Sequence, residues 1–64
     1  MIGENIRAAR KMAGVTQKEL AERLQIHQKD ISRWEKGVHV PTVEMLIKIC
    51  RELNVSADEI LELK

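Results

Sequence analysis

Cysteine, proline, glycine and aromatic residues are all scarce in this 64-residue chain, which holds one Cys, one Pro, three Gly and a single Trp. One cysteine cannot form an internal disulfide, so packing and hydrogen bonds must hold the fold, as is usual in a reducing compartment. Apolar runs are only a few residues long, and no basic segment followed by an apolar run begins the chain. We therefore expect neither a membrane span nor a signal peptide, and a single cytoplasmic domain over residues 1–64.

The chain also lacks a constellation that could support catalysis. A domain of this size buries only about 60% of the surface of its unfolded chain, which leaves little room for an enclosed active site. His27, His39 and Cys50 do not have the spacing of metal ligands, and no Ser, His and Asp set has a reason to converge. We predict no enzymatic activity, no metal, no cofactor and no small-molecule ligand.

Charge is unevenly divided along the chain, although the formal net charge is only +1. Residues 1–40 contain eight basic and five acidic residues, a net charge of +3, whereas residues 41–64 have a net charge of −2. This asymmetry is typical of a protein that presents one face to a polyanion. A solvated surface with a chance asymmetry would give the same numbers, so charge alone leaves both interpretations open.

The spacing of apolar residues predicts helices throughout and no strand. We expect a first helix over about residues 3–13, ended by Gly14, and a third helix from Gln28 to Lys36, ended by Gly37. Between them, a capping box of Thr16 with Glu19 begins a short second helix.

Two more helices follow in the C-terminal part. Pro41 and Thr42 indicate a loop and an N-cap before a fourth helix, which Asn54 can terminate. Ser56 and Glu59 form a second capping box that begins a last helix. The predicted fold is all-α, a compact five-helix bundle.

The second and third predicted helices are joined by only about three residues, 25–27, as a helix-turn-helix requires. At 100° per residue, the third helix turns Ile31 and Trp34 inward and places hydrogen-bond donors on one outward arc. These donors are Lys29, Ser32, Arg33 and Lys36, with Gln28 at the edge of the arc. Arg, Lys and Gln are side chains that recognise bases in the major groove, so this helix is predicted to bind double-stranded DNA.

Several other positions have a structural interpretation. Ala21 is expected where the two helices of the motif approach closely, because a larger side chain would separate them. Trp34 is expected in the core. Arg10 and Glu35 both lean toward the core, about 40° from Ile6 and Ile31 respectively, so we expect them to form an ion pair.

The combination of these motifs resembles the Cro and phage-repressor type of helix-turn-helix protein, known as the XRE family. The resemblance covers almost the whole chain and includes the patterns TQxELA and ISxWExG. It is carried by Ile6-Arg7, Arg10, Gly14-Val15-Thr16-Gln17, Glu19-Leu20-Ala21, Ile31-Ser32, Trp34-Glu35, Gly37, Pro41, Leu46, Ile49, Leu53, Val55-Ser56 and Asp58-Glu59-Ile60-Leu61. It implies a lambda repressor-like fold and a sequence-specific DNA-binding regulator of transcription, most simply a repressor.

The resemblance also implies roles for single residues. The residue that matches Gln17 contacts a backbone phosphate in the family and braces the first residue of the recognition helix, here Gln28. Lys29 and Arg33 would contact bases or nearby phosphates, and Lys36 with the loop 38–40 would follow the DNA backbone. The full predicted DNA-binding set is Gln17, Lys18, His27, Gln28, Lys29, Ser32, Arg33, Lys36 and His39.

Two positions depart from the family pattern. Gln25 stands where the family usually has Gly, and a left-handed conformation costs such a residue about 1 kcal/mol, so we expect a slightly rearranged turn. His27 stands where Ser or Thr usually caps the recognition helix, and we expect a poorer cap that could instead donate to a phosphate.

The last helix predicts a homodimer, at least on DNA, because its apolar side chains span too wide an arc for all of them to enter one core. The candidate contact residues are Ile60, Leu61 and Leu63. Two alternatives remain at this point. The fold could serve as a protein-interaction module, although the third helix carries no exposed apolar anchors for a partner, or the chain could be an antitoxin or a restriction-modification controller, which would still bind DNA.

Overall fold

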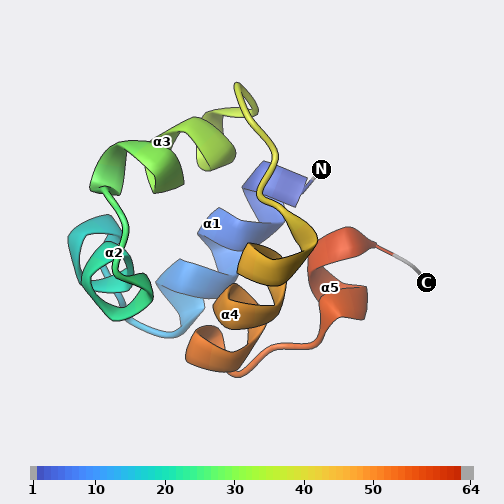
Figure 1. Ribbon diagram of the computed structural model, residues 1–64. Coiled ribbons are helices and arrows are strands. Elements are labelled where there is room, and N and C mark those ends of the chain that lie inside the picture. Colours follow the sequence, from blue (N-terminus) through green and yellow to red (C-terminus); the bar gives the residue numbers. More distant parts are fainter. Residues whose placement is uncertain (1, 63–64) are drawn as a thin grey trace.

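The computed structural model describes residues 2–62, and all regular structure in this range is helical (Figure 1). The prediction of an all-α, five-helix fold is confirmed, and the first helix begins and ends one residue earlier than expected. The helices are α1 (Ile2–Met12), α2 (Gln17–Leu24), α3 (Gln28–Lys36), α4 (Val43–Leu53) and α5 (Ala57–Leu61). None of the described helices is long and apolar enough to cross a membrane.

Side-chain caps fix where three of the helices begin. Thr16 and Glu19 form the predicted capping box of α2, with bonds of 3.0 Å and 2.9 Å in the two directions. The Thr42 hydroxyl accepts from the Met45 N–H at the start of α4. At α5 the structure shows one of the two bonds of the predicted second capping box, in which Ser56 Oγ accepts from the Glu59 N–H. These caps satisfy backbone donors that have no partner within their helix.

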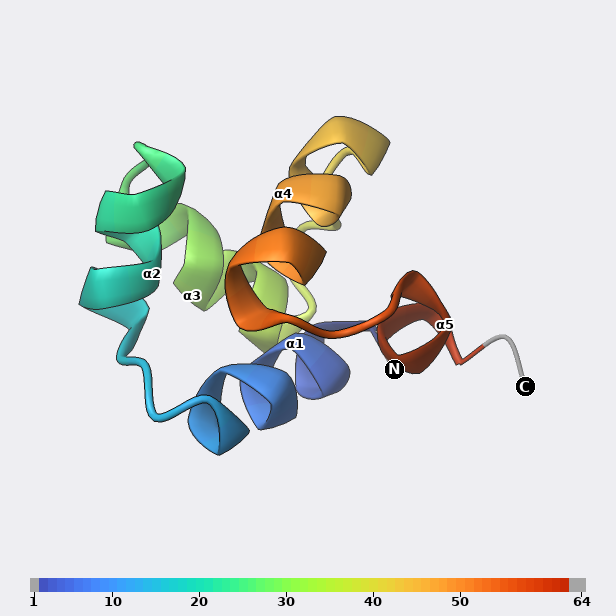
Figure 2. The same ribbon diagram turned by 90° about the horizontal axis from the view of Figure 1, so that it is seen from below.

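The core is built from every helix. The largest fully buried side chains are one per helix, Ile6, Leu20, Ile31, Ile49 and Ile60. Figures 1 and 2 show α1 and α4 in the middle of the bundle, with α2 and α3 at one end and α5 at the other. Displacement of any one helix would therefore expose apolar side chains of its neighbours.

Two contacts made by α1 position the other helices. The Asn5 amide donates to the Ile60 carbonyl at 2.9 Å, which holds α5 against α1. At Gly3 an added Cβ would collide with the Trp34 carbonyl oxygen. The absence of a side chain at Gly3 thus lets the start of α1 approach the backbone at the end of α3, and this contact helps to fix the direction of α3.

Candidate nucleic-acid interface

The turn between α2 and α3 keeps a tight left-handed geometry. Gln25 adopts φ 58° and ψ 44°, the conformation that favours glycine, and its N–H donates to the Glu22 carbonyl. The Ile26 N–H donates to the Ala21 carbonyl, and the Ile26 side chain packs against the core. The rearrangement expected from the missing glycine is therefore not observed. Buried Ala21 sits at this junction, as predicted.

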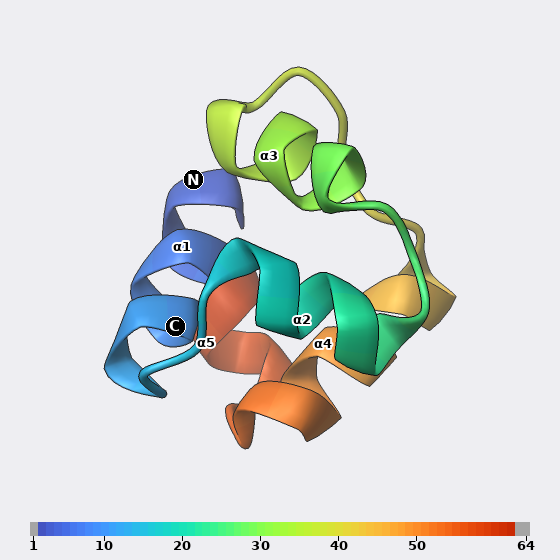
Figure 3. The same ribbon diagram turned by 90° about the vertical axis from the view of Figure 1, so that its left-hand side faces the viewer.

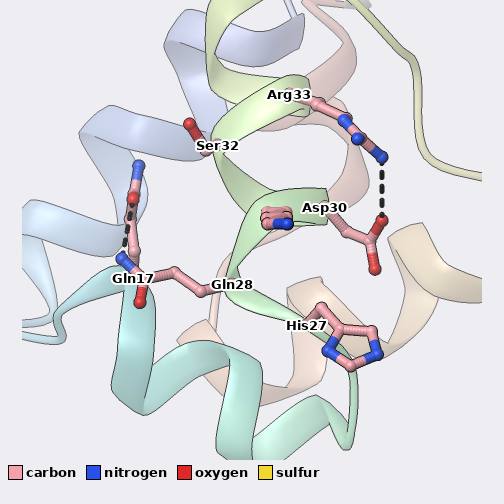
Figure 4. Close-up of a pocket in the computed structure, with 7 residues that line it drawn as sticks. Gln17, His27, Gln28, Asp30, Ser32 and Arg33 are labelled. Atoms are coloured by element: carbon pink, nitrogen blue, oxygen red, sulfur yellow. Dashed lines mark hydrogen bonds and ion pairs between the residues drawn. The ribbon is translucent and has the colours of Figure 1, made fainter.

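α2 and α3 lie together on one side of the molecule (Figure 3). A shallow hollow lies where the start of α2 meets the outer face of α3 (Figure 4). The residues that line it are Gln17, His27, Gln28, Lys29, Asp30, Ser32 and Arg33. Six of these belong to the nine predicted DNA-binding residues, so the fold brings most of the predicted set into one surface.

The remaining predicted residues surround this hollow or lie apart from it. Lys36 lines a neighbouring polar hollow that it shares with Gln17, Ser32 and Arg7. Lys18 and His39 are exposed and line neither hollow. His27 is the N-cap residue of α3, and its side chain makes no capping hydrogen bond. This agrees with the expectation that it is a poor cap.

Sequence reasoning missed two side chains at this surface. Asp30 lines the main hollow, with its side chain 40% exposed and its Oδ1 4.0 Å from Arg33 Nη1. Asp30 follows Lys29 directly and precedes Arg33 by three residues. The sequence could therefore have indicated that Asp30 lies on this surface and pairs with Arg33. Arg7 lines the polar hollow beside Lys36, and only the proximity of α1 to α3 reveals it.

Behind the surface lies the predicted ion pair. Arg10 Nε donates to Glu35 Oε2 at 2.7 Å and Arg10 Nη2 to Glu35 Oε1 at 3.2 Å, with side chains only 10% and 5% exposed. The pairing is confirmed, and each of the two residues also has a second partner. Arg10 Nη1 also donates to the Val15 carbonyl at 2.9 Å, and Glu35 Oε1 also accepts from Gln17 Nε2 at 3.0 Å.

The contact between Gln17 and Gln28 is present as the resemblance implies. Gln28 Nε2 donates to Gln17 Oε1 at 3.3 Å, and Figure 4 shows the two amides facing each other across the junction of α2 and α3. Together with the Glu35 bond, this contact links the buried ion pair to the exposed start of α3. Ile31 and Trp34, on the opposite side of α3, are buried in the core as predicted.

The residues predicted to form the dimer contact are not all available for a contact between two copies. The placement of Ile60 is wrong, because its side chain is 1% exposed and fully engaged in the core. Leu61 is half-buried and lines an apolar groove, whereas Leu63 lies outside the described residues. The groove is formed by the end of the α3–α4 loop, α4, α5 and the start of α1.

Most of the exposed apolar side chains that flank this groove belong to the loop and to α4 and not to the last helix. Val40, Val43 and Ile47 are 69%, 74% and 47% exposed and line the groove. A signal for them exists in the sequence, since Ile47 and Val43 fall outside the stripe of Leu46, Ile49 and Leu53 that enters the core.

The fold and the site together define a helix-turn-helix protein with a polar, donor-rich face on its second motif helix. A family model described as "Helix-turn-helix" matches residues 6–60. The chain belongs to this family, in its Cro and phage-repressor branch, as its motifs indicated.

The chain is similar to known proteins that include a transcriptional regulator and an antitoxin. The chain is 38% identical over 60 residues to the HTH-type transcriptional regulator ImmR of Bacillus subtilis, covering 94% of this chain and 47% of ImmR. It is also 38% identical over 61 residues to the antitoxin PezA of Streptococcus pneumoniae, covering 95% of this chain and 39% of PezA. The chain thus spans less than half the length of these two relatives.

A solved structure matches the fold over nearly its full length. The crystal structure of SinR, a master regulator for biofilm formation, in complex with DNA superposes with a TM-score of 0.88 at 32% identity. The match covers 95% of this chain and 98% of the SinR chain. This confirms the lambda repressor-like fold predicted from the sequence.

Proposed function

We propose that this chain binds double-stranded DNA by inserting α3 into the major groove, and that it regulates transcription as a repressor that occupies its operator. The observation that carries the proposal is the hollow at the junction of α2 and α3, where donor side chains from two helices form one surface. Family membership and the likeness to a DNA-bound regulator support it. A domain that occupies an operator can repress without any further activity, because it excludes polymerase.

Within this proposal the residues divide into two groups. Gln28, Lys29, Ser32 and Arg33 contact base edges, because they project from the outer face of α3. The second group contacts phosphates, since it flanks that face or lies at helix starts, where anions are favoured. It comprises Arg7, Gln17, Lys18, His27, Lys36 and His39. Asp30 is an acceptor among these donors, a role that suits the N4 amino group of cytosine.

The alternative of a protein-interaction module is less well supported. A protein partner would require apolar anchors at the centre of its contact, but the outer face of α3 is polar along its described length. An antitoxin role is compatible with the proposal, since it would use the same DNA-binding face.

Selection of bound sequences from random duplex DNA tests the proposal. We expect a single enriched motif, and we expect Lys29→Ala with Arg33→Ala to abolish the enrichment while circular dichroism shows an unchanged fold. Met12→Ala is a matched control, because Met12 is 88% exposed and lies on α1 away from the hollow. Recovery of random sequences by the unaltered chain would contradict the proposal.

We further propose that two copies bind a palindromic operator, with the apolar groove as the contact between them. The described part of the chain is 30 Å along its longest axis, whereas half-sites one helical turn apart are about 34 Å from each other. One copy therefore covers one major groove. The α3–α4 loop leads from the end of α3 to the groove, and Val40 and Pro41 of this loop line it. We therefore place the second copy next to the end of α3.

Ile47→Glu and Val43→Glu test this contact, since both side chains are exposed and their replacement leaves the core intact. We expect each to weaken binding to the palindrome about 10-fold or more and to leave binding to a single half-site unchanged. Met12→Glu, which adds the same charge outside the groove, should leave both unchanged. If Ile47→Glu and Met12→Glu behaved alike on the palindrome, the groove would not be the dimer contact.

A further inference from the structure

The buried Glu35 carboxylate contacts a side chain of the proposed DNA-binding surface. Glu35 Oε1 accepts from Gln17 Nε2 at 3.0 Å, and Gln17 Oε1 accepts in turn from Gln28 Nε2 at 3.3 Å. Glu35 is itself held by two bonds from Arg10. A continuous chain of hydrogen bonds therefore runs from the core to the first residue of α3.

This chain of hydrogen bonds has a fixed direction. A glutamine amide can present either its NH₂ group or its carbonyl oxygen to a neighbour, whereas an ionised carboxylate only accepts. Gln17 must therefore turn its NH₂ group toward Glu35 and its carbonyl oxygen away from it. That carbonyl oxygen only accepts, so Gln28 must turn its NH₂ group toward Gln17.

The direction determines what Gln28 can offer to a base. With one N–H given to Gln17, its second N–H and its carbonyl oxygen remain, a donor beside an acceptor. Adenine presents the complementary pair in the major groove, the N7 acceptor and the N6 donor. The reversed amide would direct two donors outward, which suits the O6 and N7 acceptors of guanine.

We infer that Glu35 is a positioning residue for base recognition, which acts through Gln17 to fix the amide of Gln28 in the orientation that selects adenine over guanine. The inference rests on the proposed function, since it concerns how the same surface recognises DNA. Glu35 itself makes no contact with the base.

Two variants that break the same ion pair separate positioning from stability. Arg10→Met leaves the Glu35 carboxylate in place, so Gln17 keeps its orientation. Glu35→Gln supplies an amide that can donate as well as accept, so Gln17 and then Gln28 can turn around. The readout is the ratio of affinities for two operator duplexes that differ by one A·T to G·C change at the base pair where Gln28→Ala loses preference.

We expect the unaltered chain and Arg10→Met to prefer adenine by about 10-fold or more, and Glu35→Gln to lower the ratio below about 3-fold. Binding is measured at a temperature at which circular dichroism shows each variant folded. If Glu35→Gln does not fold, Gln17→Ala replaces it, because Gln17 is only half-buried and its loss must lower the same ratio.

An unchanged ratio in Glu35→Gln or in Gln17→Ala would overturn the inference, as would a base other than adenine at the position that depends on Gln28. Either result leaves the proposed function standing, provided that the unaltered chain still selects a motif. Failure of the unaltered chain to select any sequence would instead overturn the proposed function, and this inference with it.

Discussion

Arg10 and Glu35 show how much a single buried pair can determine in so small a domain. Their charges are nearly removed from water, yet the three hydrogen-bonding groups of Arg10 and the two oxygens of Glu35 all have partners. A buried charge that keeps its partner costs little, whereas one that loses its partner is strongly destabilising. The pair also joins α1 to α3 and so helps to fix the outer face of α3.

The stability of single and double variants tests this interpretation. We expect Arg10→Met alone to lower the free energy of unfolding by about 3 kcal/mol, because the Glu35 carboxylate stays buried without its cation. Combining Arg10→Met with Glu35→Leu should restore part of that loss. Urea denaturation of the unaltered chain, Arg10→Met, Glu35→Gln and the double variant measures these differences, and thermal unfolding gives the melting temperatures. Small and equal effects of Arg10→Met and Glu35→Gln on the melting temperature would argue against a structural role for the pair.

Two residues in the left-handed conformation give a second test at the residue scale. Gln25 and Gly37 have φ values of 58° and 79°, and a Cβ at Gly37 would meet no atom within 4 Å. Gln25→Gly should therefore raise the free energy of unfolding by about 1 kcal/mol, and Gly37→Ala should lower it by about 1 kcal/mol. Thermal unfolding of both variants tests whether Gln25→Gly raises the stability and Gly37→Ala lowers it. A loss of stability in Gln25→Gly would mean that the Gln25 side chain contributes more than its backbone costs.

At the scale of the helices, the sequence predicts the elements well because their signals are local. The caps at Thr16 and Thr42 and the stops at Gly37 and Asn54 depend only on neighbours within one turn. The bond between Gln17 and Glu35 could not be predicted, because it depends on how α2 packs against α3. The error at Ile60 has the same origin: helical spacing shows that an apolar arc is wide, but the packing of α1 and α4 decides which side chain fills the core.

The capping box of α2 predicts an acid-sensitive contribution to stability. The Thr16 backbone N–H and hydroxyl lower the pKa of Glu19 below its usual value, because they bond to the charged carboxylate. A lowered pKa in the folded state means that the stabilisation is present above the ordinary glutamate pKa, about 4.3, and is lost as the pH falls through the lower folded value.

Glu19→Gln should therefore lower stability at neutral pH and make no difference once the carboxylate is protonated in both states. The test is the difference in melting temperature between the two proteins, measured from pH 7 down to pH 3. This difference should shrink as the pH falls. Glu22→Gln is the matched control, because it removes one carboxylate from the same helix outside the capping box. A constant difference across this range would mean that the charge of Glu19 does not contribute to the cap.

At the scale of the whole molecule, the fold separates a polar surface from an apolar groove. α2 and α3 lie together at one end of the bundle (Figures 1 and 3). They carry the polar surface, whereas the apolar groove is lined by the end of the α3–α4 loop, α4, α5 and the start of α1. The sequence predicted the first surface because its residues are close along the chain. It misplaced the second because the loop, α4, α5 and the start of α1 meet only in the folded protein.

The central claim is that α3 recognises bases while its flanks hold phosphates, and one set of binding titrations tests it most directly. The chain, Arg33→Ala and Lys36→Ala are titrated on the selected operator and on a scrambled duplex at several salt concentrations. Arg33 is 52% exposed and only weakly held by Asp30, so it is free to reach a base at small cost.

We predict that Arg33→Ala weakens operator binding by about 1 to 3 kcal/mol and relaxes the preference at one base pair. Lys36→Ala should weaken both duplexes alike and lower the salt slope by about one, because one fewer counterion is released. If Arg33→Ala weakened the operator and the scrambled duplex equally, Arg33 would contact only phosphate. If every variant of α3 bound both duplexes like the unaltered chain, α3 would not be the recognition helix.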